Sequence, residues 1–330
     1  MSNHDLMTVH EMAKNAAGGT ELIHRKLYDG RIPRELLQEF QIQFSRVSVP
    51  PDPTKIRVLV IQDLPGDPAS NEALGNGAFE QFHRIVAVSN WQMQAYAAYY
   101  SIPYSRFVVL HNAIDPIINH SKPDDGIVRL IYTSTPHRGL NILAPVFAKL
   151  CEKYDNIELD VFSSFKIYGW EQRDEEFRQL FDFLEAHPKI RYHGAKPNEE
   201  VREALKRADI FAYPSIWQET SCIALIEAMS AGLLCVHSNL GALAETSSNW
   251  TVMYQYQEDI NKHASMFYGM LDMAIETMNK NKKLGILDSQ KAYMDTFYSW
   301  NRRTPEWMGL LTSLLNEPRE VSEPKFVYKT

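Results

Sequence analysis

Residues 210–237 read IFAYPSIWQETSCIALIEAMSAGLLCVH, and this stretch decides the fold. Apolar runs at residues 210–213 and 233–237 predict two strands that are buried on both faces. Between them, residues 221–231 are apolar at almost every position and predict a buried helix. A strand, a helix and a strand at such short spacing are typical of a parallel sheet covered by helices.

The same alternation extends in both directions from this stretch. We predict further strands at residues 42–47, 56–61, 85–89, 107–110, 128–134, 157–162 and 190–193. We predict further helices at residues 19–28, 33–40, 90–100, 139–154, 172–186, 198–208, 259–278, 282–298 and 304–315. Residues 115–125 contain two prolines and several acidic or amide side chains, so we expect a linker between two α/β domains there.

The composition restricts the class of protein. The 330 residues suffice for two domains, and 45% hydrophobic with 23% charged residues is typical of a globular chain. A net charge of −7 argues against a general nucleic-acid binder. The sequence contains no run of about 18 apolar residues, so we expect no membrane-spanning helix. The polar N-terminus and three scattered cysteines lead us to expect a cytoplasmic protein without a disulfide framework.

Several common catalytic motifs are missing from the sequence. There is no phosphate-binding G-x-x-x-x-G-K-[ST] and no H-E-x-x-H. There is also no Asp-x-Asp pair to hold a divalent ion on a sugar nucleotide. We therefore expect no metal site and no cofactor. Gly75-Asn-Gly77 begins like a dinucleotide fingerprint but does not follow a predicted strand, so we discount it.

Two carboxylates stand out around the predicted helix at 221–231. Glu227 lies in its apolar middle, and a buried carboxylate needs a partner, which is either an internal amide or arginine or a ligand hydroxyl. Glu219 precedes the helix, whose first amides form a natural anion site. An anion cradle between two carboxylates suits a phosphate flanked by hydroxyl groups, as in a nucleotide sugar.

The spacing Glu219-x7-Glu227, followed by Ala-Met-Ser-Ala-Gly, resembles glycosyltransferase family 4, whose members are retaining nucleotide-sugar transferases with the GT-B fold. The resemblance extends from about residue 18 to about residue 315. It rests also on AGGTE at 17–21, VVLHNAID at 108–115, STPHRG at 134–139, YHGAKP at 192–197, SNLGALAE at 238–245 and SW at 299–300.

The resemblance implies an α/β fold with two Rossmann-like domains facing across a cleft. Residues 1–120 would form the acceptor-side domain, with residues 300–330 crossing back to pack on it. Residues 121–299 would form the domain that binds the nucleotide sugar.

The resemblance also implies roles for individual residues. Glu227 would accept the ribose hydroxyls, Glu219 would contact the donor sugar, and Arg138 would bind the diphosphate in place of the usual lysine. The remaining donor contacts would come from Gly18, Gly19, Ala195, Lys196 and the segment Thr220, Ser221, Cys222 and Ile223.

The sequence departs from the family pattern in three places. One is the N-terminal domain, which we expect to be short because residues 1–16 are polar and predict no strand before the glycine-rich loop. Thr133 and Ser134 stand where relatives usually carry a second basic residue; Lys166 would supply this charge, unless it is simply solvated. Asp63 stands where relatives have a histidine, and it would either share that catalytic role or cap a turn before Pro65.

We therefore predict a retaining, metal-independent glycosyltransferase that moves a sugar from a nucleotide-diphosphate sugar to a hydroxyl acceptor: a glycan, a lipid-linked sugar or a small molecule. The alternatives are a catalytically degenerate GT-B protein that binds a sugar nucleotide or a protein partner, and a sugar-nucleotide epimerase. The sequence does not indicate an oligomeric state. A basic cluster, either a solvated helix face or a peripheral membrane contact, comprises His24, Arg25, Lys26, Arg31 and Arg34.

Overall fold

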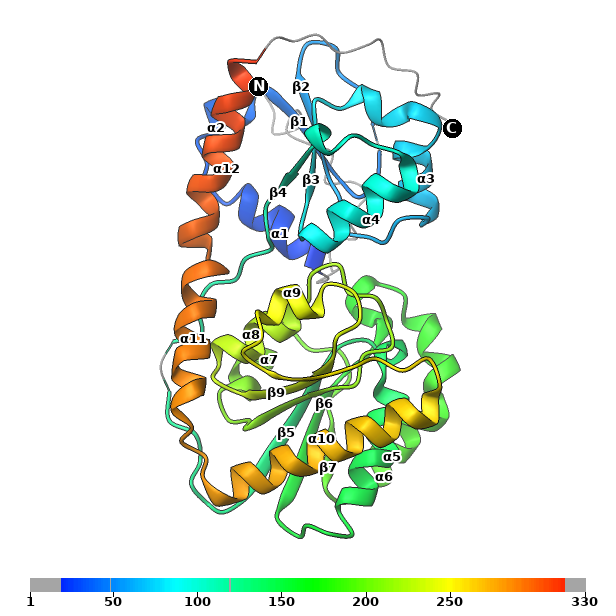
Figure 1. Ribbon diagram of the computed structural model, residues 1–330, viewed down its shortest axis with the longest axis vertical. Coiled ribbons are helices and arrows are strands. Elements are labelled where there is room, and N and C mark those ends of the chain that lie inside the picture. The colour runs from blue at the N-terminus through cyan, green and yellow to red at the C-terminus, as the bar shows by residue number, and fades with distance from the viewer. Residues whose placement is uncertain (1–18, 48, 119, 318–330) are drawn as a thin grey trace. The chain divides into compact units, whose positions relative to one another are not determined.

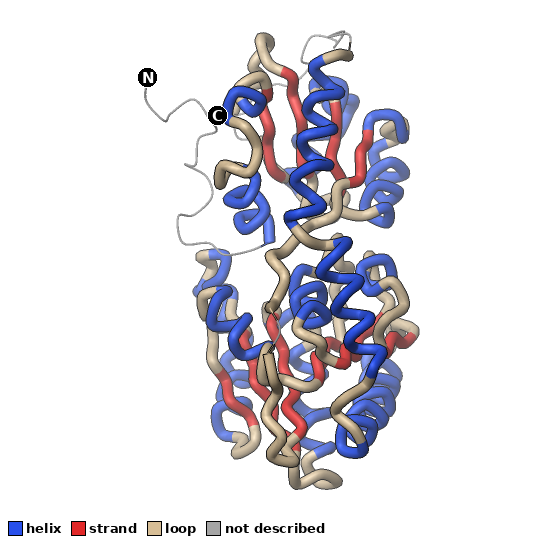
Figure 2. Tube along the Cα trace, turned by 90° about the vertical axis from the view of Figure 1, so that its left-hand side faces the viewer, coloured by secondary structure: helices blue, strands red, loops and turns tan. Residues whose placement is uncertain are grey.

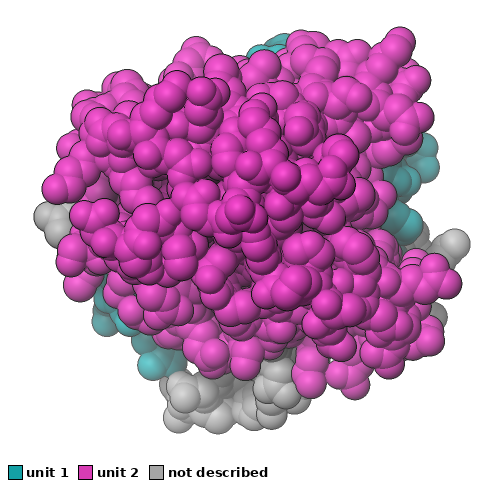
Figure 3. Space-filling view, turned by 90° about the horizontal axis from the view of Figure 1, so that it is seen from below, with its two compact units in different colours: residues 1–14, 18–113, 300–330 teal, residues 15–17, 114–299 magenta. Residues whose placement is uncertain are grey.

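The computed structural model describes residues 19–317 except residues 48 and 119 (Figure 1). The chain forms two compact units, which Figure 3 distinguishes by colour. Of the described residues, 19–113 and 300–317 form unit 1, and 114–299 form unit 2. Each unit is described by itself.

Unit 1 is built on a four-stranded parallel sheet in the order β1-β2-β3-β4. Central strand β2 is buried at every position, as expected of a strand covered on both faces. The strands of unit 1 are β1 (Phe40–Phe44), β2 (Ile56–Val60), β3 (Arg84–Ala87) and β4 (Phe107–Val109). Its helices are α1 (Gly19–Leu27), α2 (Arg34–Leu37), α3 (Pro68–Leu74), α4 (Asn90–Tyr100) and α12 (Trp300–Leu315). Helix α12 packs against α2, as expected for a final helix that crosses back to this unit.

Residues 68–81 form helical structure that we did not predict. Asp67 caps α3 because its side chain accepts a hydrogen bond from the amide of Ala69 at 3.0 Å. The 3-10 helix η1 (Gly75–Gln81) follows directly, with a kink at Asn76 and Gly77, both of which have positive φ. The helix predicted at 33–40 is shorter in the structure, because Phe40 already opens β1.

Unit 2 is built on a six-stranded parallel sheet in the order β10-β9-β8-β5-β6-β7. The order reverses between β5 and β8, which is where open α/β sheets bind ligands. The strands are β5 (Val128–Thr133), β6 (Ile157–Phe162), β7 (Ile190–Tyr192), β8 (Ile210–Tyr213), β9 (Leu234–Ser238) and β10 (Val252–Tyr254).

Two groups of helices accompany this sheet (Figures 1 and 2). In one group, α5 (Leu140–Leu150) packs against α6 (Arg178–Ala186) and α10 (Ile260–Lys280). In the other, α8 (Ile223–Ser230) packs against α7 (Asn198–Leu205), α9 (Leu243–Ser247) and α11 (Gly285–Phe297). Each group presents apolar side chains to the sheet, and together they form one continuous core.

The predicted fold class, α/β with two parallel sheets, is confirmed. The first half of the helix predicted at 172–186 is wrong: residues Glu171–Phe177 form a 3-10 helix, η5, ahead of α6. Neither α9 nor β10 was predicted. No helix among the described residues combines the length and the apolar character needed to cross a bilayer.

Candidate functional site

The candidate site lies where two neighbouring strands of unit 2 end. Strand β5 leads into a short turn that carries Arg138, and β8 leads into the loop that carries Glu219. The two strands pair directly, with Leu130 opposite Ile210. Side chains at the carboxyl ends of adjacent parallel strands lie near one another, so this edge of the sheet brings both residues together.

Arg138, which is partly buried, and Glu219, which is buried, form an ion pair. The Nη1 atom of Arg138 lies 2.8 Å from Oε1 and 3.0 Å from Oε2 of Glu219. The hydroxyl of Tyr213 also donates to Oε1, and Glu219 is only 4% exposed. Burial opposes the charged form of Arg138, but Glu219 outweighs it and raises the pKa of the guanidinium well above its ordinary value. The Nε atom of Arg138 is buried and has no hydrogen-bond partner among the described residues.

Two glycines allow the loop around Glu219 to pack this closely. Gly139 has φ +117°, and a Cβ there would lie 2.1 Å from the carbonyl oxygen of Pro214. Gly241 has φ +66°, and a Cβ there would lie 2.5 Å from the backbone oxygen of Glu219. The next amide, of Ala242, donates to that same oxygen at 2.7 Å. The Glu219 loop is therefore held between two turns that only glycine fits well.

Helix α8 starts directly after this loop. Thr220 and Ser221 lead into it, and the cap residue Cys222 makes no side-chain capping bond to the backbone. The first amides, including that of Ile223, thus lack intrahelical partners and face an end of the helix that favours anions. The hydroxyl of Ser221 is buried with no hydrogen-bond partner within the described part of the chain. Burial raises the pKa of the Cys222 thiol well above its ordinary value, so it remains a protonated small side chain.

Glu227 lies in the second turn of α8 and is 5% exposed. Its Oε1 accepts a hydrogen bond from Nη1 of Arg202 at 2.9 Å. The side-chain amide of Asn198 lies 3.3 Å from Oε1 and 3.2 Å from Oε2. Burial raises the pKa of Glu227, and the charge of Arg202 opposes that rise. The sequence predicted either an internal partner or a ligand hydroxyl for Glu227, and the structure provides Arg202 as an internal partner.

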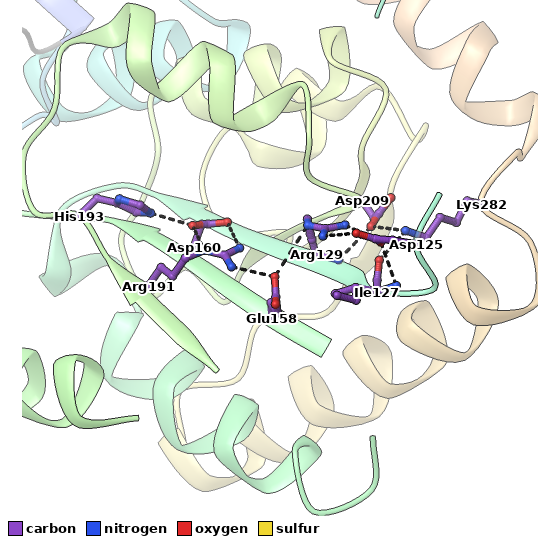
Figure 4. Close-up of polar contacts among 9 residues, drawn as sticks. All are labelled: Asp125, Ile127, Arg129, Glu158, Asp160, Arg191, His193, Asp209 and Lys282. Carbon is purple, nitrogen blue, oxygen red and sulfur yellow. Dashed lines mark hydrogen bonds and ion pairs between the residues drawn. The ribbon is translucent and has the colours of Figure 1, made fainter. Parts of the chain in front are cut away.

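The segment assigned to the base follows strand β7. Figure 4 shows the polar side chains of this part of the sheet, with His193 directed at Asp160. Nε2 of His193 lies 2.7 Å from Oδ1 of Asp160, and the imidazole stacks on Phe162 at 4.2 Å between centroids. Ala195 and Lys196 come next in the chain, and Nζ of Lys196 lies 3.8 Å from Glu200.

The other residues assigned to the donor lie elsewhere. Lys166 is 68% exposed and lies 3.7 Å from Glu171, which fits a solvated lysine. Gly19 opens α1 in unit 1, and Gly18 lies outside the described residues. Asp63 follows β2 in unit 1, where its backbone oxygen accepts hydrogen bonds from Nε2 of Gln92 at 2.9 Å and from the hydroxyl of Tyr96 at 3.1 Å.

The basic cluster at residues 24–34 is not one continuous cationic surface. His24 is buried at 9% exposure, and burial lowers its pKa, so its side chain belongs neither to a solvated helix face nor to a membrane contact. Asp29 sits among the remaining charges, 2.9 Å from Arg31 and 4.0 Å from Lys26. A carboxylate at this place reduces the positive charge of the helix face.

Sequence reasoning missed four residues of the site. Three of them contact the two glutamates: Tyr213, Arg202 and Asn198. The sequence offered one signal for them, the i, i+4 spacing of Asn198 and Arg202, which places both on one face of a helix. His137 stacks on Phe165 at 5.1 Å and meets Trp217 edge-on at 4.9 Å. Burial, followed by the charges of Arg138 and Arg173, lowers the pKa of His137 to about 4, so it is neutral near pH 7.

Comparison with known proteins identifies the family. Residues 116–266, which include both glutamates and Arg138, match the model of the glycosyl transferases group 1 family. Unit 2 belongs to this family. The predicted family is thereby confirmed for this part of the chain. Within the described residues, no group of three or more histidine, cysteine, aspartate or glutamate side chains is arranged to hold a metal ion.

Two curated relatives of this chain have phosphatidylinositol in their names. The GPI3 subunit of the Saccharomyces cerevisiae phosphatidylinositol N-acetylglucosaminyltransferase is 23% identical over 187 residues, 57% of this chain and 37% of that protein. A phosphatidyl-myo-inositol mannosyltransferase of Mycolicibacterium smegmatis is 28% identical over 170 residues, 48% of this chain and 40% of that protein. The chain thus spans less than half of the length of these relatives.

Solved structures share the fold over most of the chain. A glycosyltransferase from Rickettsia africae superposes with a TM-score of 0.68 at 14% identity and covers 93% of this chain and 85% of its own. Anabaena HepE in complex with UDP-glucose gives a TM-score of 0.63 at 15% identity, with 78% of this chain and 72% of its own covered. At these identities the similarity establishes the fold.

Proposed function

We propose that the chain is a retaining glycosyltransferase that moves a sugar from a nucleotide-diphosphate sugar to a hydroxyl acceptor without a metal ion. One observation carries the proposal: the buried Nε–H of Arg138 has no partner among the described residues and belongs to a turn beside the start of α8. Since Nη1 is held by Glu219, another edge of the guanidinium remains for a phosphate. The first amides of α8 add a second source of positive potential.

The chemistry requires a group that stabilises the departing nucleoside diphosphate. Negative charge grows on the phosphate oxygen as the anomeric C–O bond breaks, and Arg138 with the α8 N-terminus would stabilise this charge. The acceptor oxygen then forms the new bond on the same face of the sugar. Its proton passes to the departing phosphate, so no protein nucleophile is needed.

The donor would lie along the carboxyl edge of the unit 2 sheet. Glu227 would accept the ribose hydroxyls, Glu219 would border the sugar, and Ala195 with Lys196 would border the base. The donor contacts predicted for Gly19 and Asp63, both of which lie in unit 1, stay predictions. The acceptor to test first is phosphatidylinositol, because the names of the curated relatives contain it.

The test begins with nucleotide binding. Purified protein is titrated with UDP, GDP, ADP and their common sugars, with and without EDTA, and thermal unfolding and calorimetry report binding. We expect one base to be preferred, no effect of EDTA, and a loss of roughly 1.5–3 kcal/mol in Glu227→Ala, the range for hydrogen bonds to charged groups. Transfer is then followed with labelled donor and vesicles that contain phosphatidylinositol. Absence of binding to all of these ligands would refute the proposal.

A second candidate is a protein that binds a sugar nucleotide without turnover. It is favoured by Thr133, which stands where relatives usually carry a second basic residue and whose hydroxyl is buried without a partner in the described residues. Binding with neither transfer nor hydrolysis would support this candidate. Conversion of the donor to a different nucleotide sugar would instead support an epimerase.

A further inference from the structure

The two oxygens of the Glu227 carboxylate have different hydrogen-bond partners. Oε1 accepts the charged hydrogen bond from Arg202 at 2.9 Å, whereas the partner of Oε2 among the described residues is the side-chain amide of Asn198 at 3.2 Å. A carboxylate oxygen can accept more than one hydrogen bond. The ion pair therefore fixes Glu227 while it leaves acceptor capacity for a ligand hydroxyl.

Arg202 is itself held from the other side. Its Nη2 atom donates to the carbonyl oxygen of Asp115 at 2.7 Å and lies 3.4 Å from that of Pro116. The planar guanidinium thus bridges a carboxylate on α8 and the backbone that leads into unit 2. An arginine used in this way presents a rigid fork, which a lysine cannot reproduce.

The backbone that anchors Arg202 is fixed by further bonds. The amide of Ile117 donates to the hydroxyl of Ser230 at 2.9 Å, and the amide of Ile114 donates to the carbonyl oxygen of Tyr298 at 2.8 Å. Ser230 lies three residues after Glu227, so both lie on one face of α8. Residues 114–117 are therefore attached to α8 at two points, directly through Ser230 and through Arg202 to Glu227.

We propose that Arg202 is a positioning residue for nucleoside binding, which holds the carboxylate of Glu227 in the orientation that binds the ribose hydroxyls of the donor. The inference rests on the proposed function, because it assumes that a nucleotide binds at Glu227. Arg202 does not touch the nucleotide; it acts through Glu227. Loss of Arg202 leaves a buried carboxylate beside Glu199 without its counter-charge, and such a group takes up a proton or turns away.

The experiment compares ligands with and without the ribose hydroxyls. Wild type, Arg202→Gln and Arg202→Lys are titrated by calorimetry with UDP, GDP and ADP and with the 2′,3′-dideoxy form of each. We expect Arg202→Gln to weaken binding of the preferred nucleotide about tenfold, and to change binding of its dideoxy form less than about twofold. Arg202→Lys keeps the charge but not the fork, so its loss is smaller. Glu227→Gln combined with Arg202→Gln is expected to lose no more than Glu227→Gln alone.

The controls separate this inference from the proposed function. Arg207→Gln removes an exposed arginine just beyond α7 and is expected to bind both ligand forms as wild type does. Thermal unfolding without ligand shows whether each variant folds, and Arg202→Lys carries the test if Arg202→Gln does not. Equal losses for ribose and dideoxy ligands, no loss, or a gain in affinity would overturn the inference while the proposed function stands. If wild type binds no nucleotide, the proposed function fails and the inference fails with it.

Discussion

Arg138 and Glu219 form an ion pair, although the sequence predicts that they contact different parts of the donor. Nη1 of Arg138 lies 2.8 Å from Oε1 of Glu219, and Tyr213 donates to the same oxygen. The pair joins the ends of β5 and β8, so it fixes the guanidinium at the sheet edge. The residue expected to contact the sugar therefore also positions the residue expected to bind the diphosphate.

The pair predicts that Glu219 and Arg138 are energetically coupled. Glu219→Gln is expected to lower turnover by about tenfold, because Arg138 loses the carboxylate that fixes it. In an Arg138→Ala background the same substitution is expected to have little further effect. A double-mutant cycle on turnover and on binding of the nucleoside diphosphate measures the coupling. Independent effects of the two substitutions would show that Glu219 acts on the sugar alone; Glu276→Gln, on the exposed side of α10, is the matched control.

Arg138 itself is expected to act mainly in the transition state. Arg138→Ala removes a cation from the place where charge grows on the leaving phosphate, so kcat is expected to fall about 100-fold to 1000-fold. Binding of the donor is expected to weaken much less. Steady-state kinetics with donor calorimetry check this, and Lys280→Ala serves as a control because Lys280 is exposed. A rise in KM alone would give Arg138 a role in uniform binding instead.

We predict that the backbone conformation of the site requires a glycine at position 241. In Gly241→Ala the new Cβ would meet the backbone of Glu219 at 2.5 Å and the residue would keep a positive φ. We expect a loss of roughly 1–3 kcal/mol in the free energy of unfolding, measured in urea.

Gly269→Ala is the matched control for this prediction. Gly269 lies within α10, and a Cβ there would meet nothing within 4 Å. This substitution is expected to stabilise the protein by roughly 0.5–1 kcal/mol, since alanine is the better helix former. Similar effects of both substitutions would contradict the close approach at Gly241.

Regular, strongly patterned segments could be predicted from the sequence to the residue. The strands Ile157–Phe162 and Ile210–Tyr213 and the helix Asn90–Tyr100 have the predicted bounds. Residues 68–81 could not be predicted this way, because a capping aspartate and a positive-φ kink decide their structure rather than apolar periodicity. Turn chemistry of this kind leaves only a weak trace in a hydrophobic pattern.

The sequence could not predict the partners of the two glutamates, for a different reason. Arg202 is 25 residues from Glu227 along the chain, and Arg138 is 81 residues from Glu219. Only the strand order β8-β5 and the packing of α7 on α8 bring these pairs together. The motif at 219–227 identified the carboxylates, whereas their partners depend on the three-dimensional fold.

The last prediction concerns stability at acid pH and rests on His237, which is fully buried at the end of β9. Its Nδ1 lies 2.7 Å from the carbonyl oxygen of Ser238, so this nitrogen carries the proton and Nε2 accepts from the hydroxyl of Thr251 at 2.7 Å. Burial lowers the pKa of His237 to about 4. The unfolded chain, with a pKa near 6.5, therefore binds the proton first as the pH falls.

Linkage then requires the free energy of unfolding to fall between about pH 6.5 and pH 4, by roughly 3 kcal/mol for this residue, and to be unaffected by it above that range. Urea unfolding at a series of pH values is expected to show a shallower slope in His237→Gln than in wild type. His187→Gln, at a more exposed histidine, is expected to keep the wild-type slope, because less burial means a smaller difference between the folded and unfolded pKa. Parallel pH profiles for wild type and His237→Gln would mean that His237 is protonated as readily in the folded protein as in the unfolded chain.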